Sequence, residues 1–71
     1  MSTIALVYIG KSVRAHRIKR FMSQEEFAEL VGLSRDHLGR IERNEHQPHL
    51  STIKKIADKL GVNPNELVDQ D

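Results

Sequence analysis

The sequence contains no cysteine and no tryptophan, and Tyr8, Phe21 and Phe27 are its only tyrosine and phenylalanine residues. Without cysteine no disulfide can cross-link the fold, and this composition fits a reducing compartment, so we expect a cytoplasmic protein. The longest apolar run, Ile4–Ile9, is far shorter than the about 18 residues that a membrane span needs. It also lacks the positive flank and cleavage site of a secretory signal. No membrane partner is expected.

With 71 residues the chain has room for one small domain. At this size a single core rarely provides more than about 3–5 kcal/mol of net stability, so association between copies is expected. The chain is short for an enzyme, and no nucleophile–base pair, carboxylate dyad or phosphate-binding loop is recognisable. We predict neither enzymatic activity nor a cofactor. We also predict no metal site, because no cysteine or carboxylate set completes a tetrahedron around the four histidines, His16, His37, His46 and His49.

The net charge is only +1, but the charges are unevenly distributed. Five basic residues and no acidic one lie between positions 11 and 20, whereas Glu66, Asp69 and Asp71 close the chain without a basic neighbour. This polarity suits a protein that presents one face to a polyanion and turns an acidic tail away from it. The alternative is that the basic residues only solvate one face of a helix.

The apolar spacing predicts an all-α protein with five helices. Val13, Ile18 and Phe21 follow a roughly helical period, so residues 9–20 are predicted to form the first helix, with Phe21 and Met22 as a core plug. Residues 1–8 are predicted to form an apolar arm or an extension of that helix. Residues 9–69 are predicted to form the domain.

Clear start and stop signals delimit the next two helices. Ser23 and Glu26 have the spacing of a capping box, and Gly32 is typical of a helix end. Ser34 can cap the third helix, which is expected to run to about Arg43 and close at Asn44. On the second helix the apolar positions Phe27, Leu30 and Val31 are expected to face inward.

The last two helices are predicted over residues 50–60 and from Pro64 onward. Ile53, Ile56, Ala57 and Leu60 form a stripe in the fourth helix, although His49 is a poor residue to cap it. The fifth begins with a cap at Asn63, a proline at the first helical position and a glutamate at the third.

The second and third predicted helices fit the requirements of a helix-turn-helix unit. The close helix crossing needs a small residue, which Ala28 supplies, and the tight turn needs Gly32. A ten-residue helix is about 15 Å long, and the DNA major groove is about 12 Å wide, so one such helix fits the groove. The third helix is therefore predicted to present its outward side chains to base edges.

Residues 22–68 closely resemble the Cro/CI-type phage repressors, also called the xenobiotic-response-element type. The resemblance rests on the succession of SQEEFA, GLS, IER, a proline and IADKLGV in one run. It implies a lambda-repressor-like fold and a DNA-binding transcriptional regulator. The simplest such function is a repressor that acts as a homodimer on a palindromic operator.

The resemblance implies roles for individual residues. Gln24 matches the residue that holds a DNA phosphate, and alternatively it is an exposed polar residue. Arg35, Asp36 and Arg40 occupy base-reading positions, although Asp36 would also be favoured near a helix N-terminus by the dipole alone. Backbone contacts are expected beside them, so the full predicted set is Gln24, Ser34, Arg35, Asp36, His37, Arg40 and Arg43.

A structural ion pair is predicted between Arg17 and Glu42. Glu42 lies near the C-terminus of the third helix, where the dipole disfavours an anion, and the family pairs it with an arginine of the first helix. The alternative is two exposed, unpaired charges. Gly39 departs from the family pattern, and we expect it to cost helix stability while clearing space beside Arg35 and Arg40.

The expected partners are double-stranded DNA and a second copy of the chain. The dimer surface is predicted around Val62, Leu67 and Val68, with the segment Ile4–Ile9 as a further candidate. No pocket for a small-molecule effector is apparent. The alternative function is that of an antitoxin or a restriction–modification controller, whose task includes gripping a partner protein.

Overall fold

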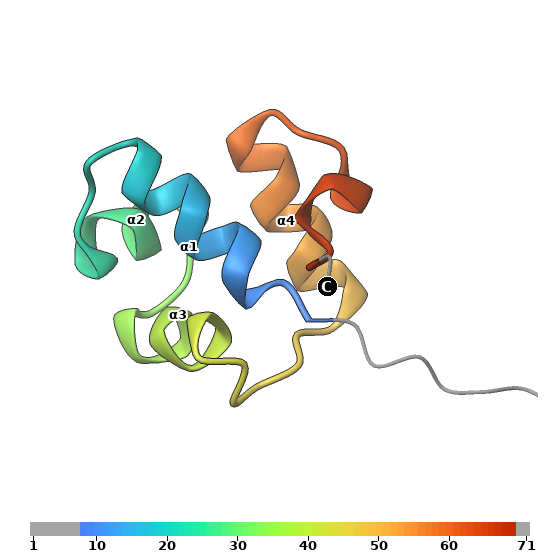
Figure 1. The fold of residues 1–71 in the computed structure, drawn as a ribbon, viewed down its shortest axis with the longest axis horizontal. Helices are drawn as coiled ribbons and strands as arrows, with labels where there is room; N and C mark the ends of the chain where they lie inside the picture. Colours follow the sequence, from blue (N-terminus) through green and yellow to red (C-terminus); the bar gives the residue numbers. More distant parts are fainter. Residues whose placement is uncertain (1–7, 70–71) are drawn as a thin grey trace, which may run out of the picture.

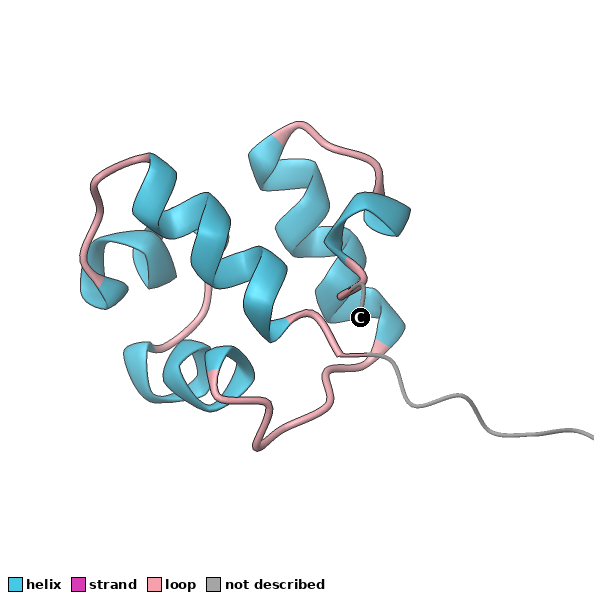
Figure 2. Ribbon diagram, viewed as in Figure 1, coloured by secondary structure: helices cyan, strands magenta, loops and turns pink. Residues whose placement is uncertain are grey.

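The computed structural model describes residues 8–69, which form four α-helices and one 3-10 turn and contain no strand (Figures 1 and 2). The all-α prediction is confirmed, but the fifth predicted helix is a single 3-10 turn. The arm predicted over residues 1–8 lies, except for Tyr8, outside the described residues. The elements are α1 (Gly10–Lys19), α2 (Gln24–Val31), α3 (Arg35–Glu42), α4 (Leu50–Leu60) and η1 (Pro64–Leu67).

One apolar core lies where the helices meet. α2 packs against α3 and α4, α1 packs against α3 and η1, and η1 also packs on α4. The largest fully buried side chains come from all five elements and from the residue before α1. They are Phe27, Ile9, Leu38, Ile41, Ile56, Leu67, Val13 and Val31.

All four helices end with the same closure. In each, the first left-handed residue after the helix is followed by a backbone amide that donates to a carbonyl of the last turn, as in a Schellman motif. The closures at Gly32, Asn44 and Gly61 match the sequence prediction. The fourth left-handed residue, Phe21 with φ 55°, was not predicted, because phenylalanine rarely adopts this conformation.

The predicted burial of three apolar residues is wrong. Phe21 is 96% exposed, because it lies beyond the end of α1 and its left-handed backbone carries the side chain outward. Of the two residues predicted to plug the core, only Met22 packs against it. Ile18 is 48% exposed and Leu30 is 38% exposed, since only part of each short helix faces a neighbour. The exposed side of α1 and α2 is therefore more apolar than the sequence pattern suggested.

Asp69, near the acidic end of the chain, is not turned away from the basic helix. The Asp69 carboxylate accepts hydrogen bonds from the backbone N–H groups of Lys11 (3.1 Å) and Ser12 (3.0 Å). The Asp69 N–H donates to the carbonyl of Tyr8 at 2.8 Å. Since Ile9 provides no side-chain cap, Asp69 caps α1 from the far end of the described chain. Glu66 completes the predicted capping box at Asn63.

Candidate nucleic-acid interface

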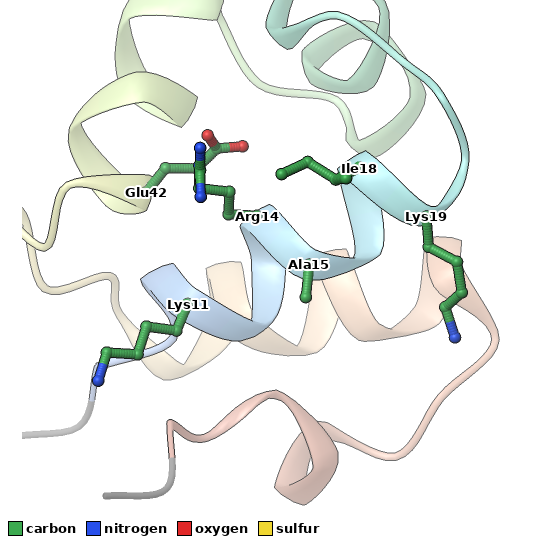
Figure 3. A pocket seen from close by; sticks show the side chains of 6 residues that line it. All are labelled: Lys11, Arg14, Ala15, Ile18, Lys19 and Glu42. Atoms are coloured by element: carbon green, nitrogen blue, oxygen red, sulfur yellow. The ribbon is translucent and has the colours of Figure 1, made fainter.

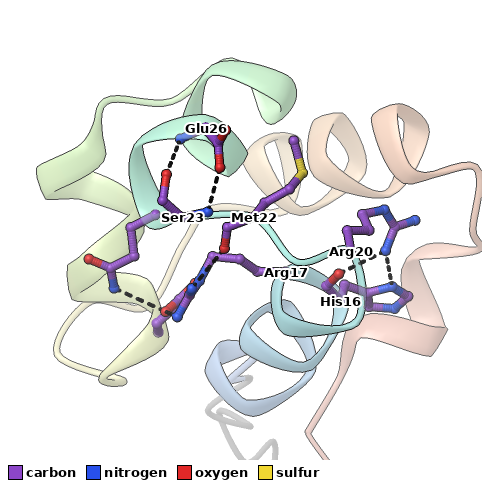
Figure 4. Close-up of polar contacts among 8 residues, drawn as sticks. His16, Arg17, Arg20, Met22, Ser23 and Glu26 are labelled. Carbon is purple, nitrogen blue, oxygen red and sulfur yellow. Dashed lines mark hydrogen bonds and ion pairs between the residues drawn. The ribbon is translucent and has the colours of Figure 1, made fainter.

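Local sequence explains how α3 begins at a fixed orientation to α2. Ser23 and Glu26 form the predicted capping box, with hydrogen bonds of 2.8 and 3.0 Å (Figure 4). Gly32 ends α2 with φ 78°, and Ser34 then caps α3 by accepting from the N–H of His37 at 3.0 Å. Only one residue, Leu33, separates the two caps of this turn. The turn thus leaves little freedom between the helices.

The two sides of α3 differ sharply. Leu38 and Ile41 are completely buried against the other helices. The predicted base-reading residues Arg35, Asp36 and Arg40 are all exposed. Their side chains make no hydrogen bond with the rest of residues 8–69, so their donors and acceptors are available to a ligand.

A buried carboxylate holds α3 to the two helices before it. Glu42, whose side chain is 2% exposed, accepts from Arg17 Nε at 2.7 Å and Nη2 at 3.1 Å, and from Gln24 Nε2 at 3.0 Å. Arg17 Nη1 also donates to the carbonyl of Met22 at 3.1 Å (Figure 4). The hydrogen bond to Glu42, more than any other contact, raises the pKa of Arg17. The predicted ion pair is present, and it also fixes the α1–α2 turn.

The pairing of Gln24 with Glu42 was not predicted. Gln24 is the first residue of α2 and is half-buried, and one of its amide hydrogens is used within the protein. The other amide hydrogen and the carbonyl oxygen remain for a second contact. A buried anion thus positions the residue that the family resemblance assigns to a DNA phosphate.

Gly39 lies close to side chains of α2 and of the end of α3. A Cβ atom at this position would lie 3.1 Å from Arg43 Nη1 and 3.7 Å from Gln24 Oε1. The glycine therefore accommodates side chains from the start of α2 and the end of α3.

Two histidines and an ion pair border the exposed side of α3. The rings of His37 and His46 meet edge to face with centroids 5.0 Å apart. Burial, then the proximity of His46 and Arg40, lowers the pKa of His37. Arg43 pairs with Glu45 at 2.8 Å, which raises the pKa of Arg43, but both side chains are more than half exposed. Because the pair is exposed and weak, Arg43 can readily exchange Glu45 for another anion.

Three long-range contacts support this surface and escaped the sequence analysis. The N–H of Gly10 donates to Asn44 Oδ1 at 3.1 Å, and a Cβ on Gly10 would lie 2.5 Å from the carbonyl oxygen of Ile41. Lys55 of α4 donates to the carbonyl of Gly32 at 3.0 Å. The third contact is the Asp69 cap. No local pattern signals them, because each joins residues at least 23 positions apart.

The predicted dimer residues do not share one surface. Leu67 is fully buried in the core and Val62 packs against it, so Leu67 is not available to a second chain. Val68 lines a hollow of about 330 Å³ together with Gln47, Pro48, Leu50, Ile53, Pro64 and Asn65. Within the described residues, no three metal-binding side chains are grouped, and no helix is long and apolar enough to cross a bilayer.

A helix-turn-helix family model, HTH_3, matches residues 13–67. The immunity repressor protein of Bacillus phage phi105 is 35% identical over 63 residues, which are 89% of this chain and 44% of the phage protein. The chain thus spans less than half of that relative's length.

Two solved structures are similar over nearly their entire length. The restriction-modification controller protein C.AhdI from Aeromonas hydrophila is 39% identical with a TM-score of 0.75, and the match covers 87% of this chain and 94% of that one. The P22 c2 repressor in complex with a synthetic operator is 26% identical with a TM-score of 0.76, and the match covers 90% and 97%.

Proposed function

This chain belongs to the helix-turn-helix family of the Cro/CI type, and from that membership we propose that it represses transcription as a homodimer bound to a palindromic operator. The family is one of DNA-binding regulators and not of enzymes, as predicted from the sequence.

The contrast between the two sides of α3 carries the proposal. Its outward residues Arg35, Asp36 and Arg40 are exposed and make no internal side-chain hydrogen bond within residues 8–69. Its inward side is fixed by core packing and by the bonds of Glu42. A rigid helix with unsatisfied polar groups on one side is what base reading in the major groove requires.

We assign contacts with DNA bases and contacts with DNA phosphates to different residues. Arg35 and Arg40 can each bind a guanine through two hydrogen bonds, and Asp36 can accept from a cytosine amino group. Phosphate contacts would come from the residues around them, where exposed or half-buried donors surround α3. These are Gln24, Ser34, His37 and Arg43.

The proposed dimer uses the hollow between the loop before α4 and η1. Leu50, which lines it, is 61% exposed, and the half-buried Pro64 and Val68 add apolar surface. A two-fold axis at this surface would pair the hollows of two copies and set two α3 helices on one face. Half-sites one helical turn apart, about 34 Å, are then expected.

Selection from a randomised duplex DNA pool at about 150 mM salt tests the proposal. We expect a palindrome, and we expect Arg35→Ala and Arg40→Ala each to weaken binding by about tenfold or more while relaxing preference at one base pair. Lys59→Ala, which removes an exposed cation from α4, is the matched control for charge alone. Equal losses for all three variants, or sequence-blind binding by the native protein, would overturn the proposal.

Sedimentation equilibrium tests the dimer separately. Leu50→Asp places a charge in the proposed interface and should convert the dimer to a monomer without changing the helical circular dichroism spectrum. Lys54→Asp on the same helix, at an exposed position outside the hollow, is its control. A native protein that stays monomeric at tens of micromolar would contradict the dimer.

A second candidate is a restriction–modification controller that can also activate transcription. The likeness to C.AhdI, which this chain matches over 94% of that protein's length, favours it. A reporter gene whose promoter overlaps the selected operator separates the two, since a repressor bound there lowers expression. Expression that rises with protein concentration would favour the controller.

A further inference from the structure

The exposed side of α1 forms a basic hollow that the proposed function does not use. At 100° per residue, Arg14, Ile18, Lys11, Ala15 and Lys19 follow one another around the exposed side of the helix. With Glu42 they line a hollow of about 610 Å³ (Figure 3). Glu42 is paired with Arg17, and no residue of α1 is acidic. The hollow therefore combines two apolar side chains with three cations that form no ion pair within residues 8–69.

The exposed side of α2 has the opposite character. Glu25, Glu29, Glu26 and Leu30 follow one another around it in the same way, and α2 has no basic residue in its last turn. Glu26 is used in the capping box, whereas Glu25 and Glu29 make no side-chain hydrogen bond within residues 8–69. Leu30 is 38% exposed beside Glu26, and Glu25 and Glu29 line a hollow with Ala28, Leu33 and Arg35. α1 thus exposes cations together with apolar residues, whereas α2 exposes anions together with one apolar residue.

We propose that the α1 hollow of one copy binds the acidic face of α2 of a second copy. Leu30 would lie against Ile18 and Ala15, and Glu25 and Glu29 would pair with the surrounding cations. Duplex DNA would satisfy the cations, but its phosphates would gain nothing from Ile18, which is 48% exposed. A second copy matches both the charge and the apolar component.

This contact joins two different faces, so each copy keeps one free face of each kind. Such a heterologous contact extends the assembly beyond a closed dimer. The charged side chains are exposed, so dissolved salt screens their attraction. The association should therefore weaken strongly as added salt shortens the screening length from about 30 Å to 8 Å. The surface is also separate from Leu50 and the hollow beside η1.

Reciprocal charge reversal in the full chain tests the contact. One variant carries Arg14→Glu and Lys19→Glu, and the other carries Glu25→Lys and Glu29→Lys. In sedimentation velocity at about 20 mM salt, the native protein should form species larger than a dimer, and these should disappear at about 300 mM. Each variant alone should associate at least about tenfold more weakly, and an equimolar mixture should recover association.

Recovery in the mixture is the decisive result, because two damaged proteins would not restore one another. Arg14→Gln, a milder change, should reduce association without reversing charge. Failure of the mixture to associate, or native association that is indifferent to salt, would overturn the contact. Loss of DNA affinity in the α1 variant with unchanged self-association would assign the hollow to phosphate instead. Glu25 and Glu29 line a hollow with Arg35, whereas Arg14 and Lys19 lie apart from Leu50, Arg35 and Arg40. The α1 variant therefore distinguishes failure of this contact from failure of the proposed function.

Discussion

The turn between α1 and α2 and the turn between α2 and α3 solve the same problem with different residues. Each contains one left-handed residue, Phe21 (φ 55°) or Gly32 (φ 78°), followed by the same backbone closure. In each, a cation outside the turn donates to a carbonyl of the turn: Arg17 of α1 to Met22, and Lys55 of α4 to Gly32.

The turns differ in burial and in backbone strain. Arg17 is 15% exposed and is bound to buried Glu42, whereas the Lys55 contact is exposed. Glycine adopts its conformation without strain, while phenylalanine does not. The first turn is thus held by a remote ion pair despite its sequence, and the second follows directly from its own residues.

Breaking the ion pair should give the largest effect. Glu42→Gln leaves Arg17 without its buried partner, and we expect the free energy of unfolding to fall by about 3 kcal/mol in urea denaturation. Lys55→Met, the matching change at the second turn, should cost about 0.5 kcal/mol or less. Glu45→Gln, which breaks the exposed pair with Arg43, should cause no measurable loss. Equal losses at Glu42 and Lys55 would remove the distinction between the turns.

Substituting the left-handed residue of each turn should give the next largest effect. The change in stability should have opposite signs at the two turns. Gly32→Ala introduces strain of about 1–2 kcal/mol and a Cβ 2.8 Å from the flexible Lys55 Cε, so it should destabilise the fold. Phe21→Gly relieves comparable strain and loses almost no burial, but it increases the freedom of the unfolded chain, so it should stabilise the fold by up to about 1 kcal/mol. Thermal unfolding measures both. A destabilised Phe21→Gly protein would mean that the aromatic ring makes a contact of its own.

The smallest predicted effect is a pH dependence near both turns. His16, which Arg20 contacts at the end of α1, and His37 each have a lowered pKa, with burial as the first cause. Above about pH 6.5 both are neutral in the folded and unfolded states, so stability does not change. Below it the unfolded chain takes up protons first, so stability falls as the pH decreases toward the lowered pKa.

Urea midpoints between about pH 7.5 and 5.5 measure this fall. His16→Gln and His37→Gln should each flatten the curve, and the double variant should flatten it most. His46→Gln removes one cause of the lowered pKa of His37 and should flatten it partly. A curve unchanged by the double variant would show that other groups determine the slope.

The difference between the turns also separates what the sequence could predict from what it could not. The second turn follows from Gly32 and Ser34, whose conformational preferences act over a few residues, and it was predicted correctly. The first turn was not, because Phe21 violates its own preference and the compensating contacts come from Glu42. The helix-turn-helix unit was therefore readable from local signals.

The features of the candidate site also divide into those that the sequence predicts and those that depend on packing between distant segments. The exposure of Arg35, Asp36 and Arg40 follows from helical periodicity, and the Arg17–Glu42 pair followed from the family resemblance. The bond from Gln24 to Glu42, the close approach at Gly10 and the cap from Asp69 depend on how distant segments pack. Leu67 was assigned to a surface because a short apolar run does not reveal which side of a 3-10 turn the core will cover.

The Asp69 cap has a consequence for chain connectivity. Because Asp69 N lies 2.8 Å from the carbonyl oxygen of Tyr8, the described fold is nearly a closed ring. A circular permutant that links Asp69 to Tyr8 through a short spacer and opens between α3 and α4 should preserve every helix. Its order would be α4, η1, α1, α2 and α3. The helix that faces DNA in our proposal would then be last to leave the ribosome, after its entire supporting frame had been synthesised.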